Sequence, residues 1–233
     1  DIVTSGLPSV AVRMSAHPLM KAIVRQLGRP IAAPSANRFG RISPTSASAV
    51  EKELSGLIPM IIDGGACREG LESTIIRPEI SADAGKKGVL IHVLRAGPVT
   101  KEMLQRFGKV VRAKKNRSED APEAPGQLAS HYAPVTPLRL LAKPSDFKPD
   151  PNKKYGLLSY CGSDKAGFIG LHDWSVVEEL SPGNGKLAEA AVRFFYVLRL
   201  LDESGVDEII AEPVSETGLG VAIMDKLRRA SVR

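Results

Sequence analysis

Polar groups that could hold an anion follow a short apolar run in the first part of the chain. Residues 30–34 are apolar, and Ser35, Asn37, Gly40 and Ser43 come soon after them, ahead of a segment with helical periodicity. Hydroxyls, free backbone N–H groups and a helix N-terminus together suit a phosphate or a carboxylate. Taken alone, the hydroxyl of Ser43 is equally compatible with a helix cap.

Two further motifs place polar side chains beside glycine turns. Ser73 lies in the Glu-Ser-Thr sequence at 72–74, which follows the Asp-Gly-Gly turn at 63–65. Arg95 ends an apolar run and stands two residues before Gly97, so its guanidinium could offer a forked donor to a phosphate or a carboxylate. A surface salt bridge explains this arginine about as well when it is viewed alone.

A polar segment and a His-Tyr pair divide the chain. Residues 112–130 are rich in charge, proline and alanine and have no apolar periodicity, which predicts a linker. The basic stretch at 112–117 could touch RNA, and a solvated connector is the alternative interpretation. His131 and Tyr132 close the linker ahead of an Ala-Pro pair. Their rings are either packing anchors or a lid over a ligand.

The elements that position these groups are predicted from apolar periodicity. Before the linker we expect strands at 8–13, 30–34, 59–63, 73–77 and 89–95, and helices at 15–28, from Thr45 as cap to Leu54, and at 100–107. After it we expect strands at 137–142, 155–160, 174–178 and 207–213, and helices at 185–204 and 219–231. Such alternation of strand and helix predicts a small α/β domain with a mainly parallel sheet.

Composition excludes several classes of protein. The chain has 233 residues and a formal net charge of +6, a mild basic excess that fits an anionic ligand such as a nucleotide. No apolar run approaches the roughly 20 residues needed to span a bilayer, and residues 1–12 have no signal-peptide pattern. Cys67 and Cys161 are too few and too far apart for a disulfide framework or a metal site. We therefore expect two reduced thiols in a cytoplasmic protein.

The motifs and their order resemble one family over nearly the whole chain. APSAN at 33–37, SPT at 43–45, DGG at 63–65, ESTI at 72–75, LR.G at 94–97 and HYAP at 131–134 occur in this order in YrdC-type L-threonylcarbamoyl-AMP synthases that carry a C-terminal extension. The final segment, from AEP at 211–213 to the basic end at 224–230, resembles the end of that extension. Ala96 and Phe39 depart from the family's usual proline and serine.

The resemblance also sets the expected domains. The family's Lys-Arg-Pro motif does not occur here, and the chain enters the family pattern at 9–13. We therefore expect that about the first hundred residues of a typical catalytic domain are missing, a length taken from usual domain size. The expected fold is α/β. It comprises the C-terminal half of a twisted YrdC-type domain at 1–111, a linker at 112–134 that crosses a basic groove, and a small Rossmann-like parallel-sheet domain at 135–233.

The family's reaction joins L-threonine, bicarbonate and ATP into threonylcarbamoyl-AMP and pyrophosphate. A downstream tRNA threonylcarbamoyl transferase then uses that product to modify the adenosine beside the anticodon. The resemblance implies that threonine or its carbamate is held by Arg13, the backbone at Ala33, and Ser73. It implies that ATP, with Mg²⁺ bridging its phosphates, is contacted by Ser9, Ser35, Ser43, Arg95 and Tyr132. Asn37 is expected only to shape its loop, and no protein metal ligand or nucleophile is assigned.

Two other functions stay open at this point. YrdC-like domains also occur in larger carbamoyltransferases, although the C-terminal extension and the HYAP linker argue against that class. The basic groove could instead belong to an RNA-binding module that carries out no chemistry. Salt-dependent RNA affinity without ATP turnover would favour this second alternative.

Overall fold

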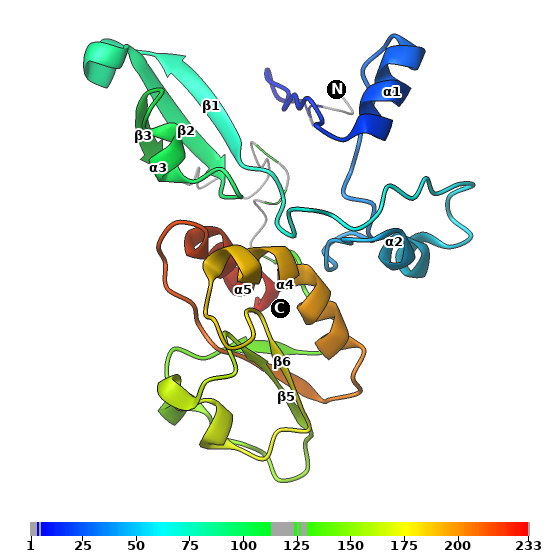
Figure 1. Cartoon of the computed structure of the whole chain (residues 1–233), viewed down its shortest axis with the longest axis vertical. Helices are drawn as coiled ribbons and strands as arrows, with labels where there is room; N and C mark the ends of the chain where they lie inside the picture. Colours follow the sequence, from blue (N-terminus) through cyan, green and yellow to red (C-terminus); the bar gives the residue numbers. More distant parts are fainter. Residues whose placement is uncertain (1–3, 5, 113–123, 125, 127–129, 233) are drawn as a thin grey trace.

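A computed structural model describes residues 4, 6–112, 124, 126 and 130–232 of the chain (Figure 1). Most of the predicted linker lies outside the described residues. The described part contains two separate sheets, one of three strands before the linker and one of four strands after it. No helix in the described residues is long and apolar enough to cross a membrane.

The first half holds the three-stranded sheet and three short α-helices. Its elements are α1 (Pro18–Leu27), α2 (Ala47–Leu54), β1 (Ile75–Ile80), the 3-10 helix η1 (Ala82–Lys87), β2 (Val89–Arg95), α3 (Lys101–Leu104) and β3 (Lys109–Arg112). β2 is the central strand, antiparallel to β1 and parallel to β3. Thr100 caps α3 as expected, whereas Ser46, one residue after the predicted Thr45, caps α2.

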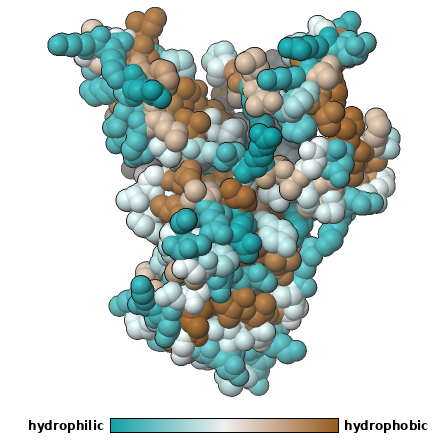
Figure 2. All heavy atoms as spheres, viewed as in Figure 1, coloured by the Kyte–Doolittle hydropathy of each residue, from teal (hydrophilic) through white to brown (hydrophobic). Residues whose placement is uncertain are grey.

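Three predicted strands are wrong. Residues 8–13, 30–34 and 59–63 have no regular secondary structure. A strand is stabilised by hydrogen bonds and side-chain contacts to a neighbouring strand, and within the described residues these segments pair with none. Their apolar side chains are accordingly exposed, with 88% of Val12, 71% of Met60 and 57% of Ile62 accessible. Figure 2 shows apolar residues reaching the surface over this part of the molecule.

The second half is the predicted parallel α/β domain. Its elements are β4 (Leu138–Leu140), η2 (Pro144–Asp146), β5 (Tyr155–Ser159), η3 (Asp164–Ala166), η4 (Ile169–Leu171), β6 (Val176–Glu179), α4 (Leu187–Asp202), β7 (Glu208–Ala211) and α5 (Gly220–Ala230). The strand order is β4-β7-β5-β6, and every neighbouring pair is parallel. The small α/β domain with a parallel sheet, expected from the alternating pattern, is confirmed.

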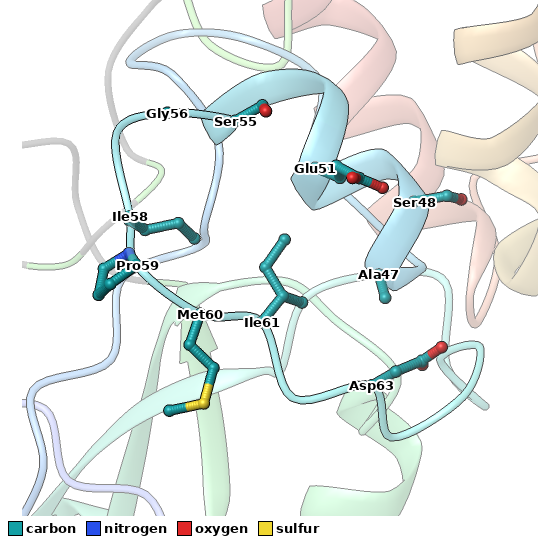
Figure 3. A pocket seen from close by; sticks show the side chains of 10 residues that line it. All are labelled: Ala47, Ser48, Glu51, Ser55, Gly56, Ile58, Pro59, Met60, Ile61 and Asp63. Atoms are coloured by element: carbon teal, nitrogen blue, oxygen red, sulfur yellow. The ribbon is translucent and has the colours of Figure 1, made fainter.

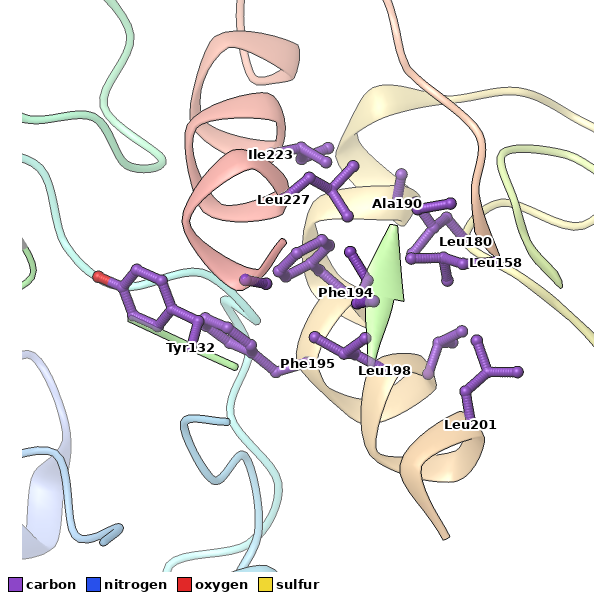
Figure 4. Packing of buried hydrophobic residues seen from close by; sticks show 14 of the residues in the cluster. Tyr132, Leu158, Leu180, Ala190, Phe194, Phe195, Leu198, Leu201, Ile223 and Leu227 are labelled. Atoms are coloured by element: carbon purple, nitrogen blue, oxygen red, sulfur yellow. The ribbon is translucent and has the colours of Figure 1, made fainter. Parts of the chain in front are cut away.

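The main core lies where α4 and α5 cover one face of this sheet (Figure 4). Phe194, Phe195 and Leu198 of α4 are fully buried there. Ile42 and Leu71, which come from loops of the first half, belong to the same core cluster. A shared core means that the first half is held against the C-terminal domain by buried apolar area as well as by polar contacts.

Polar contacts tie the loop at 37–43 and the helix α2 to α4 and to the end of the linker. The guanidinium of Arg199 donates to the carbonyl of Ile42 over 3.0 Å and pairs with the carboxylate of Glu53 at 3.0 Å. The N–H of Ala133 donates to the carbonyl of Gly40 over 2.8 Å. The anion-binding loop predicted from sequence is thus positioned by the second half of the chain.

Two adjacent residues of α4 provide a direct test of the shared core. Phe195 is 1% exposed, whereas its neighbour Tyr196 is 51% exposed. Phe195→Ala should lower the free energy of unfolding by about 3–5 kcal/mol, because it leaves a cavity among buried side chains. The measurement is urea denaturation followed by fluorescence. Tyr196→Ala is the matched control and should change stability by less than about 1 kcal/mol; equal losses for the two variants would contradict the assignment of the core.

Candidate functional site

A carboxylate near the centre of the molecule gathers residues from both halves of the chain. Glu72 lies in the loop before β1, and its side chain is 15% exposed. It accepts a hydrogen bond from the Ser43 hydroxyl at 3.4 Å and pairs with Arg95 at 3.3 Å. The oxygen that pairs with Arg95 also accepts a short hydrogen bond from the hydroxyl of Tyr132. We call Ser43, Glu72, Ser73, Arg95 and Tyr132 the Glu72 cluster.

Arg95 is held rigidly at the end of β2. Its Nε donates to the carbonyl of Ser73 over 3.0 Å, and a terminal nitrogen donates to the Ser73 hydroxyl over 3.2 Å. The two residues meet because β1 and β2 pair with Ile75 opposite Arg95. Gly97 completes the turn, since a Cβ there would overlap the backbone from Glu72 to Thr74. The strand end and the Glu-Ser-Thr loop therefore form one unit.

Tyr132 enters the cluster from the end of the linker. It is fully buried, and its ring packs 5.4 Å from that of Phe195 between ring centroids. In Figure 4 its hydroxyl points away from the helices of the C-terminal domain. Burial, reinforced by the negative charge of Glu72, raises the pKa of the Tyr132 hydroxyl well above its ordinary value, so it remains a neutral donor. Gly126 of the linker lies over this hydroxyl, where a side chain would overlap it.

Lys226 reaches the same place from α5. Its side chain is fully buried, and its Nζ donates to the carbonyl of Ala96 over 3.0 Å. The Nζ also lies 5.5 Å from the centroid of the Tyr132 ring, within the range of a cation–π contact. Burial lowers the pKa of Lys226 to about 8, while the nearby carboxylates of Glu72 and Asp225 oppose that shift.

The loop at 36–43 is held by side-chain hydrogen bonds of Asn37. The side-chain amide of Asn37 donates to the carbonyls of Arg38 and Arg41 over 2.8 and 3.1 Å, which confirms its expected role in shaping the loop. Ala36 has φ = 54°, a left-handed conformation uncommon for alanine. The buried hydroxyl of Ser43 then faces Glu72. In this structure that hydroxyl does not cap α2, since Ser46 does so.

The structure brings together half of the predicted site residues. Ser43, Ser73, Arg95 and Tyr132 all touch Glu72 or one another. The exposed residues Ser9, Arg13, Ala33 and Ser35 lie on irregular segments, and within the described chain none makes a hydrogen bond or ion pair to the Glu72 cluster. Their predicted ligand contacts, and those of the first four, stay predictions.

Sequence reasoning missed the roles of Glu72 and Lys226. Glu72 was visible in the ESTI motif beside Ser73, but a lone glutamate gives no sign that three donors converge on it. Lys226 was visible in the basic C-terminal helix, where a lysine is ordinarily solvent-exposed. Lys226 can be singled out only when it is known that α5 packs against the turn that follows Arg95.

Two hollows lie outside the Glu72 cluster. One of about 480 Å³ lies between α2 and the apolar segment at 58–61, with Asp63 at its edge (Figure 3). The other, of about 270 Å³, separates the two halves near Arg41, Lys52 and Asp202. Neither is lined by any of the predicted ATP or threonine residues.

Comparison with known families and proteins places the whole chain. Residues 99–232 match the family described as the C-terminal domain of threonylcarbamoyl-AMP synthase, and residues 1–97 match a family described as "Telomere recombination". Two threonylcarbamoyl-AMP synthases each match this chain at 37% identity. The protein of Pyrococcus abyssi matches over 99% of the chain, and that of Bacillus subtilis over 98%. The fold and the sequence together define a two-part α/β protein of this class. The chain belongs to the threonylcarbamoyl-AMP synthase family.

Solved structures agree with this placement. A structure of the Pyrococcus abyssi protein complexed with L-threonine superposes with a TM-score of 0.79 at 36% identity and covers 99% of this chain. A variant of that protein, in which a neighbouring histidine and tyrosine are both alanine, gives a TM-score of 0.74 at 33% identity over 97% of this chain. The chain spans about two thirds of the length of these relatives, with 66% and 65% of the two curated proteins covered.

The buried amine of Lys226 predicts a specific pH dependence of stability. Because its pKa is lowered from 10.5 to about 8 in the folded chain, the unfolded chain binds more protons between these two values. Burial of Lys226 therefore costs most below pH 8, and the cost is relieved as pH rises towards 10.5. In that window Tyr132 stays neutral, because its pKa is raised, and His131, whose pKa is lowered by burial, is already neutral.

The measurement is urea denaturation of the wild type and of Lys226→Met from pH 7 to 10. The unfolding free energy of the wild type, minus that of the variant, should be constant below pH 8 and should increase above it. The same comparison with Lys165→Met, which changes an exposed lysine, should give a flat difference. Parallel curves for wild type and Lys226→Met would show that the amine is not perturbed.

Proposed function

We propose that the protein containing this chain forms threonylcarbamoyl-AMP and pyrophosphate from L-threonine, bicarbonate and ATP. The product would go to a downstream tRNA threonylcarbamoyl transferase, and we propose that the reaction takes place in the cytoplasm. The observation that carries the proposal is the contact between Arg95 and Ser73 in a chain of this family. It joins the residue assigned to ATP with one assigned to threonine.

The proposed reaction requires positive charge in a fixed position, which the contact between Arg95 and Ser73 can supply. Threonine and bicarbonate would first condense to threonine carbamate with loss of water. An oxygen of the carbamate would then attack the α-phosphorus of ATP, and the bond to the departing pyrophosphate would break. Both reactants are anions, so positive charge and fixed positions supply most of the needed effect. Arg95 provides a guanidinium whose direction is fixed by Ser73 and Glu72 before any ligand arrives. A donor oriented in advance stabilises charge at little reorganisation cost.

The remaining assignments follow from the resemblance. Threonine or its carbamate would be held by Arg13, the backbone at Ala33, and Ser73. ATP would be contacted by Ser9, Ser35, Ser43, Arg95 and Tyr132. The complex of the Pyrococcus abyssi relative with L-threonine supports threonine as a ligand of this family. For Tyr132, the buried position against Phe195 supports the anchor interpretation, and contact with ATP would require the hydroxyl to leave Glu72.

Mg²⁺ is proposed to arrive with ATP. In the described ranges, no group of three or more His, Cys, Asp or Glu residues is arranged to hold a metal ion. Mg²⁺ commonly keeps several waters and is bound through substrate phosphates with one or two carboxylates at most. An ion that arrives bound to the phosphates of ATP needs few ligands from the protein.

The basic test is pyrophosphate release by a catalytically competent chain that contains these 233 residues. Release should require L-threonine, bicarbonate, ATP and Mg²⁺ together. Omission of threonine should abolish it, because the carbamate that attacks ATP could not form. Salt-sensitive RNA binding with no threonine-dependent release of pyrophosphate would instead support an RNA-binding module.

Substitution of Arg95 tests the assignment of the ATP side. Arg95→Ala should weaken ATP binding by about 10- to 100-fold, since a hydrogen bond to a charged group contributes about 1.5–3 kcal/mol. L-threonine binding should weaken less. Calorimetry with each ligand measures both effects, and Arg77→Ala, on the exposed part of β1, is the matched control. Unchanged affinity for ATP would contradict the assignment of Arg95.

A further inference from the structure

One residue of the C-terminal domain touches the backbone that carries Arg95. Lys226 of α5 donates from Nζ to the carbonyl of Ala96, the residue that follows Arg95. Gly97 then packs on the Glu-Ser-Thr loop, with no room for a side chain. A displacement of this carbonyl would therefore move the turn that carries the guanidinium of Arg95.

Burying the ammonium group of Lys226 costs free energy. The need to fill space in the core does not by itself explain why a lysine stands at this position. A buried ammonium group is unfavourable unless hydrogen bonds and opposite charges compensate. A methionine would fill a similar volume without that cost. The charged groups around the amine come from every element packed on it: Glu72 and Asp225 are acidic, Arg95 and Arg229 are basic, and His131 is nearby and partly buried. The polar end of Lys226 is thus used for a specific contact.

Lys226 also contacts Tyr132, which lies at the end of the linker. Its Nζ lies over the Tyr132 ring, and the Tyr132 hydroxyl binds Glu72, which pairs with Arg95. Two paths therefore lead from α5 to Arg95. One runs through the Ala96 carbonyl and the other through the Tyr132 ring and the Glu72 carboxylate.

We propose that Lys226 is a positioning residue through which the C-terminal domain sets the orientation of Arg95 for its ligand. The proposal rests on the proposed function, in which Arg95 contacts the nucleotide. It gives the C-terminal domain a defined contribution to the reaction: α5 holds the Arg95 turn in its binding geometry. Lys226 itself does not touch substrate.

The experiment compares Lys226→Met with Lys165→Met in a catalytically competent chain that contains these residues. At pH 7.5, Lys226→Met should raise the KM for ATP by about tenfold and change the KM for L-threonine by less than about threefold. Hydrogen exchange in the 95–99 segment should become faster. Lys165→Met, at an exposed position, should change none of these quantities.

Introduction of Lys226→Met into Arg95→Ala separates positioning from general destabilisation. If Lys226 acts through Arg95, the Lys226→Met substitution should raise the KM for ATP by less than about twofold when Arg95 is already alanine. A full additional tenfold loss in the double variant would overturn the proposal, as would equal losses for both substrates. If Arg95→Ala alone left ATP binding unchanged, the assignment of Arg95 to ATP in the proposed function would be wrong. The exchange experiment would still show whether Lys226 orders the 95–99 segment, and unchanged exchange there would overturn the positioning role by itself.

Discussion

The arrangement of the two halves depends on the hydrogen bonds and the ion pair that the Glu72 carboxylate makes. This carboxylate receives the Ser43 hydroxyl from the loop at 36–43, the Arg95 guanidinium from β2 and the Tyr132 hydroxyl from the linker. A mostly buried carboxylate is stable only when such donors satisfy it. Because the three donors come from three separate segments, satisfying one group fixes the relative position of all three.

The apolar core makes the same connection on a larger scale. Ile42, Leu71 and Tyr132 belong to the core cluster built mainly by α4 and α5. The loops that carry the candidate site are therefore packed on the C-terminal domain, and the domain contributes directly to their shape. The segments at 8–13 and 59–63 lack such support in the described structure, and their apolar side chains are exposed.

The sequence predicted those elements whose stability is mostly local or strongly patterned. The long helix α4 was found because its apolar periodicity matches its burial, and the strand at 89–95 because its apolar run forms the central strand of its sheet. The segments at 8–13, 30–34 and 59–63 have equally apolar sequences but no neighbouring strand in the described residues. Strand formation depends on such a non-local partner, which a single-segment pattern cannot reveal.

The candidate site was predictable to a similar extent. Motif order identified Ser43, Ser73, Arg95 and Tyr132, which the structure brings together. The convergence on Glu72 and the burial of Lys226 could not be predicted, because both arise from contacts between segments more than 20 residues apart. The anchor role of Tyr132 was one of two interpretations, and only its packing against Phe195 favours it.

The most direct test of the central claim is a double-mutant cycle on the bond between Glu72 and Tyr132. Glu72→Gln and Tyr132→Phe keep the size of each side chain and remove the charge or the hydroxyl. Chemical denaturation of the wild type, both single variants and the double variant gives the coupling free energy. If the Glu72 carboxylate joins the linker to the first half, the coupling should be about 1.5–3 kcal/mol, as for a hydrogen bond to a charged group. Losses that add to within about 0.3 kcal/mol would show that the two residues stabilise the fold independently, and would contradict this account.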